Sequence, residues 1–358
     1  MSENSSIAGK KLKELLAHIE TKQSLTEYLA EYTMKQLKDE VRLAISYSKE
    51  TITNMNDFCD DLVRHDHEEA DTLMILHAYD VACKNIFREC VVVSPDTDVF
   101  LLLLHFYEKM PNAIIFRTGK KEKLREISIQ KCFEAIGTKH ASAILGFHTL
   151  TGCDQIGRFA GKSKTTWWNI FQNADDDMLT ALANLGNQEA LPDLTTLEHI
   201  ERFVASAYTD KRLCKSISSL PVLRWNLFSK FQWEAGQLPP TSSALKCKVF
   251  RSHFCCIVLK RSLQGTQNLP SPEGYGWEIN DGTLEQIMTD NLPAPIALIE
   301  LSVCSCKTGC TTKRCKCLKH KLICTDMCKC QNCENDNNFY DENYDDFEYF
   351  ENDSEVED

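Results

Sequence analysis

The sequence lacks the segments that mark membrane-spanning and secreted proteins. No apolar run approaches the roughly 20 residues that a transmembrane helix needs, and residues 1–10 are polar where a signal peptide would be apolar. The chain also contains no internal repeat, which argues against a solenoid. We therefore expect an intracellular protein with no membrane partner, in the nucleus or the cytoplasm, with the nucleus favoured.

Basic residues are absent from the end of the chain. Residues 334–358 contain 12 Asp and Glu and no Lys or Arg, which accounts for the whole formal net charge of −12. The rest of the chain is formally neutral, so the low pI does not exclude a nucleic-acid partner. We expect residues 335–358 to be disordered, because their charge forbids a core. Such a tail either only solvates the protein or imitates a nucleic-acid strand on the basic surfaces.

The 358 residues have room for two or three domains. Apolar periodicity predicts helices and strands in alternation, which is typical of a three-layer α/β domain with a parallel sheet. Helices are expected at residues 68–84, 99–106, 129–136, 142–150, 165–171 and through much of 196–263, and strands at 41–47, 91–93 and 113–116. Two further helices are expected within 10–37, the second opened by a capping box of Ser24 and Glu27.

These elements suggest five regions. We predict a helical lead-in with a strand at 1–60, the α/β domain with a helical extension at 61–233, a helix and linker at 234–300, a cysteine module at 301–334 and the acidic tail at 335–358. The linker is expected at 269–295, which is rich in Pro, Gly and Asn.

Two carboxylates follow the strand predicted at 91–93. Its run of three valines predicts burial on both faces of a parallel sheet, and ligands bind beyond the carboxyl ends of such strands. Asp96 and Asp98 lie there, although either could simply cap the helix that follows. With Glu69, Asp71 and Asp154 they form a set of five acids that would repel one another unless cations neutralised them. Mg²⁺ or Mn²⁺ suits such oxygen ligands, and a pair of ions can promote phosphodiester hydrolysis.

The set resembles the metal-binding half of the flap-endonuclease and PIN-like nuclease superfamily. The shared features are Glu-Ala-Asp opening a helix, Asp-x-Asp after an apolar strand, and Gly-x-Asp before a basic turn. The resemblance implies a PIN-like fold, a Mg-dependent structure-specific endonuclease, metal-binding and catalytic roles for Glu69, Asp71, Asp96, Asp98 and Asp154, and contact of Arg158, Lys162 and Lys164 with a DNA backbone, with RNA as an alternative partner. The chain also resembles mobile-element-like animal proteins that join such a domain to a cysteine cluster.

The chain departs from that family upstream of Glu69. Family members begin with a strand that carries a first aspartate, and no acidic residue here follows an apolar strand before Glu69. We therefore expect a truncated or decayed copy with one metal site nearly complete, the other poor, and impaired activity. Glu69 and Asp71 would diverge on a regular helix, so both can converge only at its first turn. His65, His67 and His77 fit no zinc motif and are expected to be core or exposed residues.

The chain has 18 cysteines, and half of them lie in one short segment. In a reducing compartment clustered cysteines more often bind metal than form disulfides. Nine thiolates suit three tetrahedral zinc ions if three of them bridge, and two four-cysteine sites with a spare thiol are the alternative. The nine are Cys304, Cys306, Cys310, Cys315, Cys317, Cys324, Cys328, Cys330 and Cys333.

The repeated Cys-x-Cys pairs resemble those of tesmin/TSO1-type CXC domains. That resemblance implies binding to DNA or chromatin proteins, with phosphate contacts from Lys313, Arg314 and Lys316, whereas a structural knot balanced by its lysines is the plainer interpretation. Two functions remain open at this stage. One is a metal-dependent nuclease-like protein, and the other is a non-catalytic DNA- or chromatin-binding protein that uses the zinc cluster.

Overall fold

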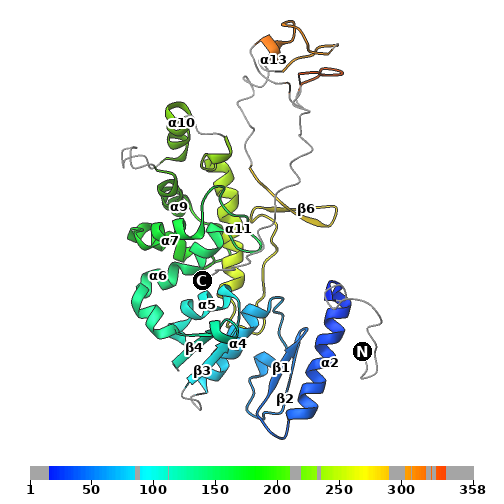
Figure 1. Cartoon of the computed structure of the whole chain (residues 1–358), viewed down its shortest axis with the longest axis vertical. Coiled ribbons are helices and arrows are strands. Elements are labelled where there is room, and N and C mark those ends of the chain that lie inside the picture. Colours follow the sequence, from blue (N-terminus) through cyan, green and yellow to red (C-terminus); the bar gives the residue numbers. More distant parts are fainter. Residues whose placement is uncertain are drawn as a thin grey trace. The chain divides into compact units, whose positions relative to one another are not determined.

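The computed structural model describes residues 16–84, 89–111, 113–209, 219–231, 235–289, 303–307, 309–319, 324 and 328–335. They belong to two compact units, Met1–Asp290 and Asn291–Asp358, which are treated separately (Figure 1). None of the helices in these ranges combines the length and the apolar character needed to cross a membrane.

The first unit opens with a helix beside a small hairpin. Helix α2 spans Ile19–Leu37, and strands β1 (Ala44–Tyr47) and β2 (Glu50–Thr53) pair antiparallel. The predicted helix start at Ser24 is wrong: Ser24 lies inside α2, which has no Gly or Pro to interrupt it and begins after His18. The single turn α3 follows at Asp60–Val63.

The central sheet has three strands in the order β3-β4-β5. Strand β3 (Glu89–Val93) runs parallel to β4 (Ala113–Thr118), which confirms the predicted parallel pairing, but β5 (Arg125–Ser128) runs antiparallel to β4. Val92 is buried, whereas Val91 and Val93 are 38% and 61% exposed. The prediction that this strand is buried on both faces is therefore wrong, because β3 ends the sheet order and only one of its faces packs against the core.

Helices supply most of that core. They are α4 (Ala70–Cys83), α5 (Thr97–His105), α6 (Ile129–Thr151), α7 (Lys164–Gln172), α8 (Asp176–Asn184), α9 (Leu194–Tyr208), α10 (Leu220–Phe231) and α11 (Ser242–Lys260). Helix α6 bends at Gly137, whose φ of 78° is non-helical, so the two helices predicted at 129–136 and 142–150 form one kinked element. Its second half is buried among α5, α8 and α11. A Cβ at Gly146 would lie 2.1 Å from the carbonyl oxygen of Leu182, so only glycine permits the observed approach of α6 and α8.

A hairpin stands within the range predicted to be a linker. Strands β6 (Trp277–Asn280) and β7 (Thr283–Gln286) pair through Asp281 and Gly282, whose φ values of 49° and 79° are those of a type I′ turn. Trp277 is only 7% exposed and packs edge-on against Phe254 of α11, with 5.6 Å between ring centroids. The linker prediction is wrong here, because Asp-Gly and the aromatic anchor outweigh the loop-like composition.

The chain between α11 and the hairpin is also held in place. The backbone N–H of Gln267 donates to Asp66 Oδ1 at 2.8 Å, and the Arg251 guanidinium donates to the Gly276 carbonyl at 3.1 Å. His67 Nε2 lies 2.7 Å from the Gln264 carbonyl oxygen. These contacts join residues far apart in sequence and make the segment one wall of the pocket described below.

In the second unit the described residues form loops and one short helix, α13 (Lys316–Lys319). Five of its cysteines, Cys304, Cys310, Cys315, Cys317 and Cys324, are 1–5% exposed, and they form the buried centre of the unit. The predicted disordered tail, residues 335–358, lies outside the described residues apart from Asn335.

Candidate metal centres

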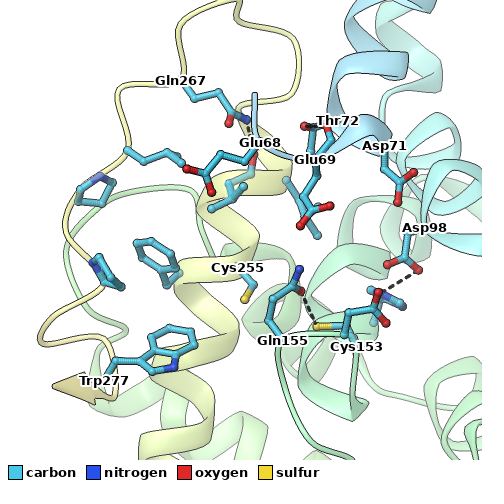
Figure 2. A pocket seen from close by; sticks show the side chains of 18 of the residues that line it. Glu68, Glu69, Asp71, Thr72, Asp98, Cys153, Gln155, Cys255, Gln267 and Trp277 are labelled. Atoms are coloured by element: carbon cyan, nitrogen blue, oxygen red, sulfur yellow. Dashed lines mark hydrogen bonds and ion pairs between the residues drawn. The ribbon is translucent and has the colours of Figure 1, made fainter. Parts of the chain in front are cut away.

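Three of the five predicted carboxylates meet in the first unit. Asp71 stands in the first turn of α4, and Asp96 and Asp98 lie where β3 passes into α5. One carboxylate oxygen from each lies within 4.8 Å of the others, which is close enough to hold a metal ion. Asp71 and Asp98 face each other in the close view of the site (Figure 2).

The turn after β3 fixes the two later acids. The backbone N–H of Asp96 donates to Ser94 Oγ at 3.0 Å, and Asp96 Oδ1 accepts from the backbone N–H of Asp98 at 2.9 Å. Asp96 is therefore the N-cap of α5, as the capping alternative predicted. A carboxylate has two oxygens, so capping through Oδ1 leaves Oδ2 to face the cluster.

Charge repulsion is visible at Asp71. Burial, together with the nearby charges of Asp96, Asp98, Glu69 and Asp154, raises the pKa of the Asp71 carboxyl to about 6. A group of acids that suppresses the ionisation of its own member is under electrostatic strain, and a bound cation would relieve it. The donor set, oxygen atoms only, fits a hard divalent ion.

Asp98 is held ionised by a neighbour that the sequence did not reveal. His148 Nε2, on α6, lies 3.2 Å from Asp98 Oδ1, as an ion-pair contact rather than a well-directed hydrogen bond. Burial acts to raise the pKa of Asp98, but the contact with His148 and the charge of Lys164 outweigh it and lower that pKa. No motif spacing identifies His148. Its one signal is that it is the only titratable side chain in the buried stretch 143–150.

Glu69 and Asp154 flank the triad without joining it. Glu69 is the N-cap residue of α4 but makes no side-chain capping bond, and Asp154 follows the Gly152-Cys153 turn after α6. Both line the same pocket as Asp71, and both contribute to its raised pKa. The predicted convergence of Glu69 and Asp71 is thus limited to electrostatic contact, because the start of α4 separates their side chains.

The predicted DNA-contacting turn is partly engaged within the protein. Lys164 Nζ donates to the His148 carbonyl at 3.0 Å and to Thr151 Oγ1 at 2.9 Å, and burial lowers its pKa to about 8. Lys162 Nζ lies 4.5 Å from the centroid of the Tyr208 ring. Arg158 is exposed. Contact with a nucleic-acid backbone stays a prediction, and of the three residues Arg158 presents the most accessible side chain for it.

The acids occupy one end of a pocket of about 580 Å³. Its other end is apolar and is formed by α11 and the segment that leads into the hairpin (Figure 2). Between them Cys153 and Cys255 share a hydrogen bond, which lowers the pKa of the Cys153 thiol and raises that of Cys255. The lining residues include Glu69, Asp71, Asp98, His148, Cys153, Asp154, Phe254, Cys255, Val258, Leu259, Leu269, Pro270, Pro272, Trp277 and Leu284.

The second candidate centre is the cysteine cluster. Its sulfurs form three overlapping groups of four that could each hold an ion: Cys304, Cys310, Cys324 and Cys330; Cys304, Cys315, Cys317 and Cys324; and Cys304, Cys306, Cys310 and Cys315. Cys304 belongs to all three groups, and Cys328 and Cys333 belong to none of them.

Sulfur spacings in the cluster fit tetrahedral coordination. Cys304 Sγ lies 3.7 Å from Cys310 Sγ and 3.7 Å from Cys324 Sγ, and Cys317 Sγ lies 3.6 Å from Cys328 Sγ. A tetrahedral site with metal–sulfur bonds of about 2.3 Å places its sulfurs about 3.8 Å apart. The thiols are therefore arranged as ligands of metal ions, and Cys328 lies in contact with the group through Cys317.

Basic side chains surround this cluster. Lys313, Arg314 and Lys316 are exposed, whereas Cys315 and Cys317, between and beside them, are buried. Alternation of inward thiols and outward cations gives the module a basic surface. In the first unit, His65 and His67 are buried at 5% and 3% exposure, which confirms the core alternative for them, and no described histidine belongs to a metal-binding group.

No protein-family model, curated protein or solved structure gives a significant match to the chain. Functional inference therefore rests on the residues and their geometry.

Proposed function

We propose that the acidic pocket of the first unit binds a divalent cation, Mg²⁺ or Mn²⁺, and belongs to a nuclease-like protein that acts on or binds DNA, with impaired activity in this chain. The observation that carries the proposal is the convergence of Asp71, Asp96 and Asp98 to within 4.8 Å from two separate elements. The order of these motifs along the chain, which resembles the flap-endonuclease and PIN-like superfamily, supports phosphodiesters as the substrate.

The residues of the pocket have distinct parts in this proposal. Asp71, Asp96 and Asp98 hold the cation, and His148 keeps Asp98 in its ionised, ligating form. A divalent cation bound here supplies Lewis-acid polarisation of a phosphoryl oxygen and lowers the pKa of a water molecule. Glu69 and Asp154 lie close enough to act on Asp71 electrostatically and are placed to accept hydrogen bonds from such water.

The proposed impairment follows from the number of ligands. Phosphodiester hydrolysis by this superfamily relies on two ions that stabilise the attacking and leaving oxygens. Only one carboxylate group of three or more is present among the described residues, and Glu69 and Asp154 alone are poor ligands for a second ion. Cation binding is therefore expected to persist while cleavage is slow or absent.

The test uses the full-length protein and the double variant Asp96→Ala/Asp98→Ala. We expect calorimetry to show Mn²⁺ binding in the native chain and none in the variant. The matched control is Asp176→Ala/Asp177→Ala, an exposed acidic pair in the first turn of α8, which should bind Mn²⁺ as the native chain does. Cleavage assays on flap, fork and single-stranded DNA accompany the binding measurement.

Two results would contradict parts of the proposal. Fast cutting by the native chain, lost in Asp96→Ala/Asp98→Ala, would show that the activity is not impaired. Absence of Mn²⁺ binding in the native chain, or equal binding in the double variant, would overturn the cation site and the nuclease assignment with it.

The second candidate function is binding of DNA or chromatin proteins through the cysteine cluster loaded with about three zinc ions. The exposed cations Lys313, Arg314 and Lys316 favour it, since phosphate contacts need accessible positive charge. Reversing these three charges should weaken duplex binding and reduce its salt dependence by about three contacts. Unchanged binding would leave the cluster a structural knot.

A further inference from the structure

The pocket contains more than the acidic residues need. Its second half is an apolar wall made by Phe254, Val258 and Leu259 of α11 and by Leu269, Pro270, Pro272, Trp277 and Leu284. A cation site requires only oxygen ligands and water, so these residues have no part in holding an ion. They point to a ligand that has an apolar surface next to its charged group.

The wall is a built surface rather than a loosely folded loop. Trp277 is 7% exposed and packs against Phe254, and the segment that carries it is tied to Arg251 through the Gly276 carbonyl and to Asp66 through the Gln267 N–H. These tertiary contacts keep the wall apart from the acids, so that the pocket stays open between them (Figure 2).

Part of the wall is accessible to a ligand. Leu269 and Leu284, both on the segment after α11, are 39% and 47% exposed where they line the pocket. The side-chain amide of Gln267, also in the lining, is already engaged with the Val258 carbonyl at 3.0 Å. The wall therefore offers apolar and aromatic contact and little hydrogen-bonding recognition.

We propose that this wall holds the base of one unpaired nucleotide whose phosphate reaches the acidic cluster, so that the substrate or ligand is single-stranded nucleic acid and not an intact duplex. The proposal rests on the proposed function. Bases in a duplex are stacked inside the helix and reach a pocket only when extruded. Stacking on aromatic and apolar side chains accepts any base, which agrees with the lack of polar recognition in the wall. The volume of about 580 Å³ is within the range of pockets for ligands of nucleotide size.

The test compares two probes on the full-length protein. One is a fluorescent four-nucleotide single strand, and the other is the same strand with abasic residues, which keeps every phosphate and removes every base. The quantity measured is the Mn²⁺-dependent part of binding, taken as the difference between fluorescence anisotropy titrations with and without added Mn²⁺. Any binding by the lysines of the cysteine cluster does not depend on Mn²⁺ and cancels in this difference.

We expect the abasic strand to bind about tenfold more weakly, since stacking contributes substantially for each base. The variant Leu269→Ser/Leu284→Ser should weaken binding of the base-containing strand about fivefold and leave the abasic strand unchanged. Both leucines are exposed, so the fold should tolerate the change. Leu191→Ser, at a 44% exposed leucine that does not line this pocket, is the matched control and should alter neither probe.

Equal Mn²⁺-dependent affinity for the two strands would overturn the base-binding wall while leaving the cation site intact. Calorimetric Mn²⁺ binding without any Mn²⁺-dependent binding of either strand would also overturn it. Loss of Mn²⁺ binding itself is the separate result that removes the proposed function, because it reports on Asp71, Asp96 and Asp98 and not on the wall.

Discussion

The two candidate metal centres are built in opposite ways. The carboxylates of the first unit stand on α4 and on the β3–α5 turn, elements whose positions are fixed by a large apolar core. The thiols of the second unit are themselves the buried centre, with Leu318 as the only other apolar side chain packed against them. In the first unit the fold creates the site, whereas in the second the metal must create the fold.

Removal of metal should therefore have its largest effect on the second unit. A strong chelator is expected to unfold residues 303–335, because structural zinc contributes on the order of 10 kcal/mol in small modules of this kind. Amide hydrogen exchange should show lost protection there and unchanged protection in α6 and α11. Elemental analysis should give about three zinc ions per chain before treatment. One zinc or none in a folded module would contradict the trinuclear arrangement.

Single cysteine substitutions sharpen the comparison within the second unit. Cys304 belongs to all three groups of four sulfurs and Cys306 to one. We expect Cys304→Ser to lose most of the bound zinc and Cys306→Ser to lose about one ion, as measured by zinc content per folded chain. Cys83→Ser, at an exposed cysteine of the first unit, is the control and should lose none. Equal losses from the two cluster variants would show that Cys304 is not shared.

The carboxylate site should respond to pH instead. The raised pKa of Asp71, about 6, means that a proton competes with the cation below that pH. We expect Mn²⁺ affinity to be nearly constant above pH 7 and to fall by about tenfold for each unit well below pH 6. Calorimetry across this range measures it. An affinity that stays flat down to pH 5 would mean that Asp71 is not a ligand.

The smallest expected effect is on the stability of the first unit. A carboxyl whose folded pKa exceeds its unfolded value binds protons more tightly when folded, so its contribution to stability falls as pH rises from about 4 to 6. Without divalent metal at pH 7, Asp71→Asn should therefore stabilise the unit by about 1 kcal/mol after allowance for solvent screening. The gain should shrink toward pH 4.

Denaturation followed by tryptophan fluorescence isolates this effect, because all five Trp lie in the first unit. Asp80→Asn is a control of the opposite sign, since Asp80 accepts from Lys84 Nζ at 2.7 Å and its loss should destabilise slightly. Destabilisation by Asp71→Asn at pH 7 would contradict the proposed repulsion among the acids.

Local signals in the sequence located the acidic triad. The helix over 70–83, the strand ending at Val93 and the turn before α7 follow from periodicity and capping residues, and together they place Asp71, Asp96 and Asp98. The cysteine cluster is visible from spacing alone. These features depend on contacts between neighbours in the sequence.

Features that depend on distant contacts could not be predicted in this way. Nothing near Val91 or Val93 indicates that β3 stands at the end of the sheet order, because that depends on which strands pair. His148 meets Asp98 only because α6 packs beside α5. The apolar wall was missed because its loop-like composition concealed Trp277, although Asp281-Gly282 is a recognisable hairpin signal.

The double engagement of Asp96 bears on how such a site would decay under selection. Asp96 caps α5, so its replacement costs about 1 kcal/mol of stability even in a lineage that no longer uses a cation. Asp71 has no such second task, and at neutral pH its burial among like charges opposes folding. Once chemistry ceased to matter, drift would be expected to remove Asp71 first and Asp96 last. The presence of Asp71 in this chain is therefore a stronger sign of a cation site in use than the presence of Asp96.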